Sequence, residues 1–157
     1  MTELDRIDRN LLRLLQKDNQ LTNLELAKLA NLSPPTCLRR VRRLREEKII
    51  VADVSIVDPA RVGQKLFVFV EVTLERQTER MQRAFEQKMT AAAEVMQCYM
   101  ISGQSDFVIV VLVPGMEEYH SFVRSVLADD PNIRNFRSMF AMNRTKFRIE
   151  VDPDAVF

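Results

Sequence analysis

Residues Ser33 to Lys48 read SPPTCLRRVRRLREEK and form the most basic stretch of the chain. Six of the last ten residues in this stretch are arginine or lysine. On a helix, with about 100° between successive residues, its apolar and basic side chains separate onto different sides. The apolar flank is predicted to hold Cys37, Leu38, Val41 and Leu44. The stretch therefore predicts a helix that packs one flank into a core and presents a cationic face to solvent.

Two shorter helices are predicted ahead of this basic helix. Residues 5–18 begin with an aspartate at a possible N-cap and continue with leucines at helical spacing. Thr22 and Glu25 have the spacing of a capping box, which predicts a second helix over 22–30. Ser33 offers a cap to the third helix, and the two prolines after it suit a first turn. Three helices with a tight turn before a cationic third one are typical of a helix-turn-helix DNA-binding domain.

The third helix is predicted to bind double-stranded DNA. The arginine side chain has a rigid fork of donors that fits phosphate oxygens or a guanine edge, and hydroxyl groups at a helix start can bind phosphates. The predicted contacts are Ser33, Thr36, Arg39, Arg40, Arg42 and Arg43. Arg45 falls near the apolar flank, so we expect it to pair or pack within its own domain. The alternative is a charged helix that is merely solvated, but the cap, turn, apolar stripe and charge all favour DNA binding.

Composition excludes several functional classes. Net charge is +1, but residues 1–50 carry +4 and the remainder −3, so the basic bias coincides with the predicted DNA helix. Two distant cysteines predict neither a disulfide framework nor a metal site. Three scattered glycines and one histidine give no phosphate loop, dinucleotide motif or catalytic triad, so no enzyme and no cofactor are predicted. The apolar runs are too short to span a membrane, which favours a cytoplasmic protein.

The second half of the chain alternates between strand-like and helix-like segments. Strands are predicted over 50–57, 66–74, 95–101, 107–113, 135–142 and 146–151, with helices after Thr78 and after Pro114. From residue 66 the order is β-α-β-β-α-β with a trailing strand, which predicts a ferredoxin-like sandwich with both helices on one sheet face. The whole chain is therefore predicted to be α+β, with a winged-helix-like helix-turn-helix domain over 1–50, a hinge strand and linker over 51–65, and a second domain over 66–157.

The predicted sheet leaves one face uncovered. Residues 66–70 are apolar at every position, so Phe67 and Phe69 would stand on the face away from the helices. Pairing of two chains through this face would bury both rings and place two DNA helices for half-sites roughly 34 Å apart. The alternative is that the chain's own terminal strand covers them.

Segments spread over nearly the whole chain resemble one known family. They are LDRIDRNLL from Leu4, QKD from Gln16, LSPPTCLRRVRRL from Leu32, VFVEVTL from Val68 and SGQSD from Ser102. In these segments the chain resembles the Lrp/AsnC (leucine-responsive regulatory protein, feast/famine) family of bacterial transcriptional regulators. The resemblance implies a C-terminal domain for effector binding and oligomerisation, homodimers that assemble into octamers, and a free amino acid bound between dimers. It also implies a cytoplasmic, nucleoid-associated protein.

The resemblance places the effector site at the turn over 102–106, closed by residues from a neighbouring subunit. The implied site residues are Met100, Ile101, Ser102, Gly103, Gln104, Ser105, Asp106, Met139, Phe140 and Ala141. Backbone amides of 103–105 would hold the carboxylate of the amino acid and Asp106 its ammonium group. The alternative is an ordinary hairpin turn in which the aspartate bonds to backbone.

Methionines on both sides of this site favour leucine or methionine over asparagine or a charged amino acid. Alternatively, these methionines are only core. The sequence thus predicts a sequence-specific transcriptional regulator that responds to an amino acid, with double-stranded DNA, a free amino acid and further copies of the chain as partners. The alternative function is an architectural oligomer that compacts DNA with little choice of sequence.

Overall fold

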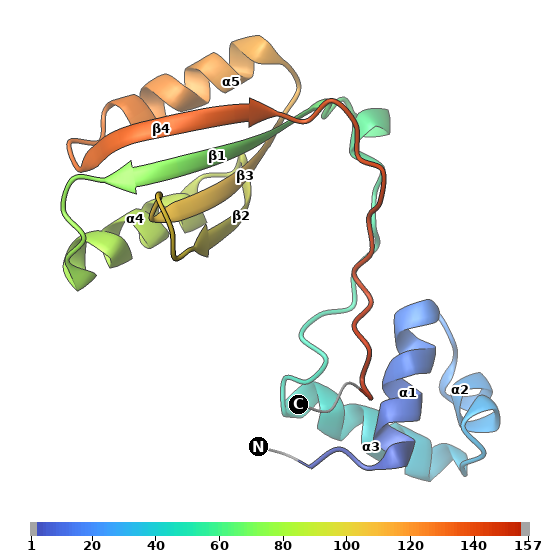
Figure 1. The fold of residues 1–157 in the computed structure, drawn as a ribbon. Helices are drawn as coiled ribbons and strands as arrows, with labels where there is room; N and C mark the ends of the chain where they lie inside the picture. Colours follow the sequence, from blue (N-terminus) through green and yellow to red (C-terminus); the bar gives the residue numbers. More distant parts are fainter. Residues whose placement is uncertain (1–2, 155–157) are drawn as a thin grey trace. The chain divides into compact units, whose positions relative to one another are not determined.

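The structure is a computed structural model that describes residues 3–154 and divides into two compact units (Figure 1). The helical unit comprises residues 3–56 together with 146–154, and the sheet domain comprises Val57–Thr145. All helices in the described residues are too short or too polar to cross a membrane.

The helical unit contains α1 (Arg6–Lys17), α2 (Asn23–Leu29) and α3 (Pro34–Glu46). Both predicted N-caps form: the side chain of Asp5 accepts from the Asp8 amide, and Thr22 and Glu25 make a reciprocal capping box. Ser33 occupies the N-cap position of α3, but its side chain makes no cap bond. Its hydroxyl donates instead to Thr36 Oγ1 at 2.8 Å. The predicted helix-turn-helix arrangement is therefore confirmed, with a different partner for the serine.

The core of the helical unit is a small apolar cluster contributed by all three helices. Its buried members are Leu11, Leu12, Leu26, Ala27, Cys37, Val41 and Leu44. Leu38 was predicted to join them, and that prediction is wrong because its side chain is 57% exposed. Positions 37, 41 and 44 repeat along one narrow stripe of the helix, whereas position 38 lies about 100° away from position 37. The buried stripe of α3 is thus narrower than the sequence pattern suggested.

The sheet domain has the predicted β-α-β-β-α-β order. Its elements are β1 (Leu66–Leu74), α4 (Glu79–Ala91), β2 (Val95–Met100), β3 (Phe107–Val113), α5 (Met116–Phe122), a π-helical continuation (Val123–Ala128) and β4 (Ile133–Phe140). The strand order is β2-β3-β1-β4, and every neighbouring pair is antiparallel. The α+β class and the ferredoxin-like topology are therefore confirmed, although β4 begins and ends two residues earlier than predicted.

Both helices of the sheet domain cover the same sheet face. Phe85 of α4 and Phe122 of α5 belong to one core cluster with alternate residues of β1 from Val68 to Leu74. On the opposite face Phe69 is exposed, and the guanidinium of Arg144 lies 5.2 Å from the ring centre of Phe67. Within one chain, no strand of the described residues covers this face.

Two segments predicted as strands, 50–57 and 146–151, are not strands in the described part of the chain. A strand exists only where a neighbouring backbone completes its hydrogen bonds, and alternation of side chains alone cannot supply that neighbour. Apolar side chains such as Val51 and Ile149 are exposed in these extended segments. The C-terminal segment belongs to the helical unit, where Gln16 and the backbone of Val151 exchange two hydrogen bonds of 2.8 and 2.9 Å. The predicted second domain, by contrast, ran to residue 157.

Candidate DNA interface and effector site

The arginines of α3 lie on different sides of the helix. Arg39 and Arg42 are exposed, and the side chain of Arg42 is 77% accessible while its Nε donates to Glu46 Oε1 at 2.7 Å. Arg45 lies 3.0 Å from Asp53 through an ion pair, which agrees with the expectation that it pairs within its own domain. The exposed side of α3 therefore offers Arg39 and Arg42 to a partner.

Arg40 and Arg43 turn toward α1 instead. Arg40 Nη1 donates to Asp5 Oδ2 at 2.7 Å and to Asp8 Oδ1 at 2.9 Å. Arg43 Nη2 donates to Asp8 Oδ2 at 2.5 Å. Both arginines were predicted to face DNA beside Arg39, but their charged ends meet carboxylates of the same unit. The physical reason is that α1 packs along this side of α3 and supplies a buried negative charge there.

Asp8 is the residue whose contacts sequence reasoning missed. It is 1% exposed and accepts from two arginines. The hint in the sequence was an acidic residue three positions after the N-cap of α1. A capping box already accounts for an acid at that position. Only the packing of α1 against α3 shows that the same carboxylate also holds the basic helix.

Asp5 and Arg40 each stabilise the charged form of the other. The backbone amide of Asp8 and the guanidinium of Arg40 lower the pKa of Asp5 from 3.8 to about 2. The same carboxylates raise the pKa of Arg40 above its ordinary value. Asp5 and Arg40 therefore stay ionised together at every pH near neutrality.

The start of α3 is polar and exposed. Ser33 and Thr36 join their hydroxyl groups there, and Asn23 Nδ2 donates to the carbonyl of Pro34 at 2.9 Å, which ties α2 to the first turn of α3. These two hydrogen bonds therefore hold in place the turn that carries the predicted phosphate-binding hydroxyl groups.

The predicted effector turn is anchored to the end of β1 through Asp106. Asp106 Oδ2 accepts from the Leu74 amide at 2.7 Å, and the Asp106 amide donates to the Val72 carbonyl at 2.9 Å. The Ile101 amide donates to the Asp106 carbonyl at 2.9 Å and closes the turn. This geometry supports the structural alternative for Asp106, with the difference that its carboxylate bonds to a neighbouring strand. Its role toward an ammonium group stays a prediction.

The two halves of the predicted effector site lie far apart within one chain. Met100 pairs with Phe107 at the beginning of β3, which lies beside the end of β1. Phe140 pairs with Val68 near the beginning of β1, on the opposite sheet edge. One chain therefore cannot bring the turn over 102–106 together with 139–141, and a joint site requires a neighbouring subunit.

The methionines of both halves are exposed. Met100 and Met139 present 54% and 39% of their surface, and Met142 is almost fully accessible. The alternative that these methionines are only core is therefore wrong for the single chain. Gly103, in the turn between them, has open space where a side chain would begin.

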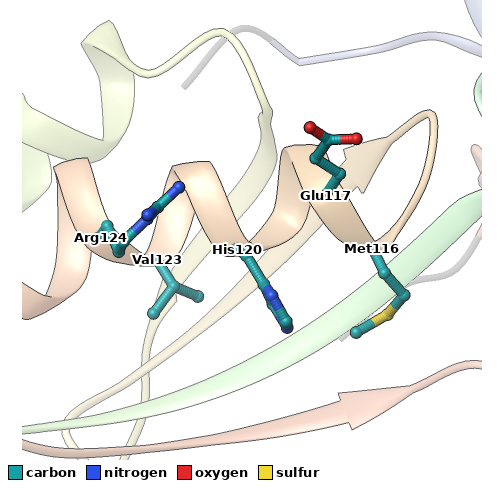
Figure 2. A pocket seen from close by; sticks show the side chains of 5 residues that line it. All are labelled: Met116, Glu117, His120, Val123 and Arg124. Atoms are coloured by element: carbon teal, nitrogen blue, oxygen red, sulfur yellow. The ribbon is translucent and has the colours of Figure 1, made fainter.

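A hollow of about 580 Å³ runs along α5 and its continuation (Figure 2). It is lined by Met116, Glu117, His120, Val123 and Arg124, and none of the predicted effector residues takes part. Figure 2 shows Met116 and His120 projecting from the same side of the helix, while Glu117 points the other way. His120 is exposed at this hollow.

Comparison with known proteins follows the same two-part division. Residues 4–51 match the winged helix-turn-helix DNA-binding family, and residues 67–151 match the Lrp/AsnC ligand binding domain. The chain belongs to the Lrp/AsnC family. This regulator is 41% identical over 146 residues to an uncharacterised HTH-type transcriptional regulator of Haemophilus influenzae, covering 93% of this chain and 87% of the relative. It is 35% identical to the leucine-responsive regulatory protein of Escherichia coli K12, covering 92% and 88%.

Solved structures of the family have the same fold. An AsnC family transcriptional regulator from Agrobacterium tumefaciens superposes with a TM-score of 0.88 at 33% identity, covering 94% of this chain and 96% of the other. A transcriptional regulator from Neisseria meningitidis in complex with L-methionine gives a TM-score of 0.85 at 27% identity, covering 92% and 94%. The protein is thus a DNA-binding transcriptional regulator with a ligand-binding domain, in a family that is not enzymatic.

Proposed function

We propose that this Lrp/AsnC regulator binds specific DNA sequences through α3. We further propose that leucine or methionine binding changes its DNA affinity or its assembly. The observation that carries the effector proposal is the exposure of Met100 and Met139 on the two halves of the predicted site. On α3, Ser33, Thr36, Arg39 and Arg42 are the proposed DNA contacts, because they lie at its exposed start and on its exposed side.

Leucine and methionine suit the chemistry of the proposed site. Methionine side chains are apolar and adaptable, and Ile101 adds a branched apolar side chain beside the polar turn. Such a lining favours an unbranched or γ-branched apolar amino acid and penalises a buried charge or amide. The names of two relatives support this choice, since one is called leucine-responsive and another was solved with L-methionine.

Assembly is part of the proposal. The exposed sheet face around Phe69 suits pairing with a second copy, and the two separated halves of the effector site suit contacts between dimers. We therefore propose homodimers that assemble into octamers and act on the nucleoid in the bacterial cytoplasm. The amino acid would lie between dimers, with the amides of 103–105 at its carboxylate.

To test whether the protein prefers particular DNA sequences, the full chain is used to select duplexes from a random pool. The selected duplex and a shuffled duplex of equal composition are then compared at two salt concentrations. We expect the selected duplex to bind at least about 1,000-fold more tightly, as is usual for specific regulators. Equal affinities at both salt concentrations would instead support the architectural alternative, because phosphate contacts alone do not distinguish sequences.

Effector choice is tested by thermal shift of the full chain with each of the twenty amino acids. Leucine or methionine at about 100 times its Kd should stabilise the protein by roughly 2.7 kcal/mol and raise the melting temperature by a few degrees. Norleucine is the matched probe for an apolar side chain without sulfur, and asparagine and lysine are the controls. A larger shift with asparagine or lysine would contradict the apolar site.

A further inference from the structure

The buried carboxylate of Asp8 lies between α1 and the basic helix α3. One of its oxygens accepts from Arg40 and the other from Arg43, at 2.9 and 2.5 Å. Its exposed fraction is only 1%, so water and salt screen these contacts less than those of an exposed carboxylate. A buried carboxylate is costly unless charges of opposite sign surround it, and here two arginines do so.

The two arginines are less exposed than Arg42. The side chains of Arg40 and Arg43 are 21% and 40% exposed, against 77% for Arg42. The Nε atoms of Arg40 and Arg43 are buried and have no hydrogen-bond partner among the described residues. Their Nη contacts with Asp8 point both guanidinium groups toward α1.

The positive and negative charges of the side chains around Asp8 are equal in number. Arg40 and Arg43 supply two positive charges, and Asp5 and Asp8 supply two negative ones within hydrogen-bond distance. Of the four arginines predicted to face DNA, only Arg39 and Arg42 therefore remain as a net positive charge for phosphates. Arg42 shares its charge with Glu46, but the side chains of this pair are 77% and 61% exposed, so the pair contributes little.

We propose that Asp8 is a positioning residue for DNA recognition, which withholds Arg40 and Arg43 from the DNA phosphates and fixes the angle at which α3 presents Arg39 and Arg42. This inference rests on the proposed DNA-binding role of α3. Each cation that engages a phosphate releases counterions and adds affinity that is independent of sequence. By holding Arg43, and Arg40 together with Asp5, Asp8 lowers non-specific affinity and so raises the ratio of specific to non-specific binding.

The first test removes arginine charges and measures how the salt dependence of binding to a shuffled duplex changes. R39Q combined with R42Q should reduce the slope of log K against log salt by about 1–2, at roughly 0.9 per phosphate contact. R43Q should leave this slope unchanged, even though it lowers the melting temperature. A reduction of about 0.9 by R43Q alone would overturn the inference, because Arg43 would then be a phosphate contact.

The second test removes the negative charge of Asp8, which holds Arg40 and Arg43 toward α1. D8N keeps the size of the side chain but removes its charge, while Arg40 keeps its ion pair with Asp5. We therefore expect the slope to steepen by about 1 and the ratio of specific to non-specific affinity to fall at least about 10-fold. D53N is the matched control, because the same change releases Arg45, an arginine of α3 that is not among the proposed DNA contacts, and we expect the slope to stay unchanged. An unchanged slope and ratio in folded D8N would overturn the inference.

Folding is checked by circular dichroism and thermal melting at the temperature of the binding assay. If D8N is unfolded there, the R43Q comparison alone decides the inference. Wild-type protein that binds no duplex would overturn the proposed function and this inference with it, whereas wild-type binding with a lowered R43Q slope overturns only the inference.

Discussion

Replacing Leu44 by alanine should lower the free energy of unfolding of the helical unit by about 2–5 kcal/mol, the usual cost of a cavity in a core. The Leu44 side chain is fully buried and contacts the cluster that joins α3 to α1 and α2. Leu38→Ala removes the same atoms from the same helix, but from a side chain that is 57% exposed. We expect it to cost less than about 1 kcal/mol.

The measurement is urea denaturation of the full chain followed by circular dichroism. The two variants are matched because each deletes the same group from the same helix. Similar losses in both would mean that α3 is rotated relative to its neighbours, and the assignment of its exposed side would have to change as well.

Replacing Asp106 by asparagine should weaken the binding of leucine or methionine at least about 10-fold, since a hydrogen bond to a charged group contributes roughly 1.5–3 kcal/mol. Asparagine can still accept from the Leu74 amide, which the carboxylate does now at 2.7 Å. The turn should therefore persist while its negative charge is lost. Isothermal titration calorimetry measures the change, and DNA binding without effector should survive.

Asp106→Ala is the companion variant. It also removes the acceptor for Leu74, so we expect a further loss of about 1–3 kcal/mol in stability of the sheet domain. If Asp106→Asn binds both amino acids with wild-type affinity, Asp106 only ties the turn to β1, and the ammonium group must find another partner.

The order of elements was predictable from local patterns. The capping residues Asp5 and Thr22 and the apolar run of β1 each signal their element within a few residues, and all three are where the sequence predicted them. The segments 50–57 and 146–151 show where such patterns fail. Alternation describes which side chains suit a sheet, whereas a strand also needs a second backbone at hydrogen-bonding distance.

The predicted effector site likewise combines features that local patterns predict with features that they do not. Exposure of Met100 and Met139 and the separation of their strands follow from the strand order β2-β3-β1-β4, which no local pattern encodes. The sequence and its family resemblance suggested the residues and a contribution from a second subunit. The fold then supplied the reason, because antiparallel pairing sends the end of β2 and the end of β4 to opposite ends of β1.

The basic helix α3 shows most clearly what each level of description contributes. Its helical form, its proline-rich start and its cationic character are local properties of residues 33–48, because turn chemistry, periodicity and charge act over a few positions. The partners of its arginines are not local. Asp8 lies more than thirty positions earlier in the chain, and only the packing of α1 against α3 brings its carboxylate to Arg40 and Arg43. Burial then makes that contact strong, because a carboxylate removed from water must be neutralised by the charges beside it.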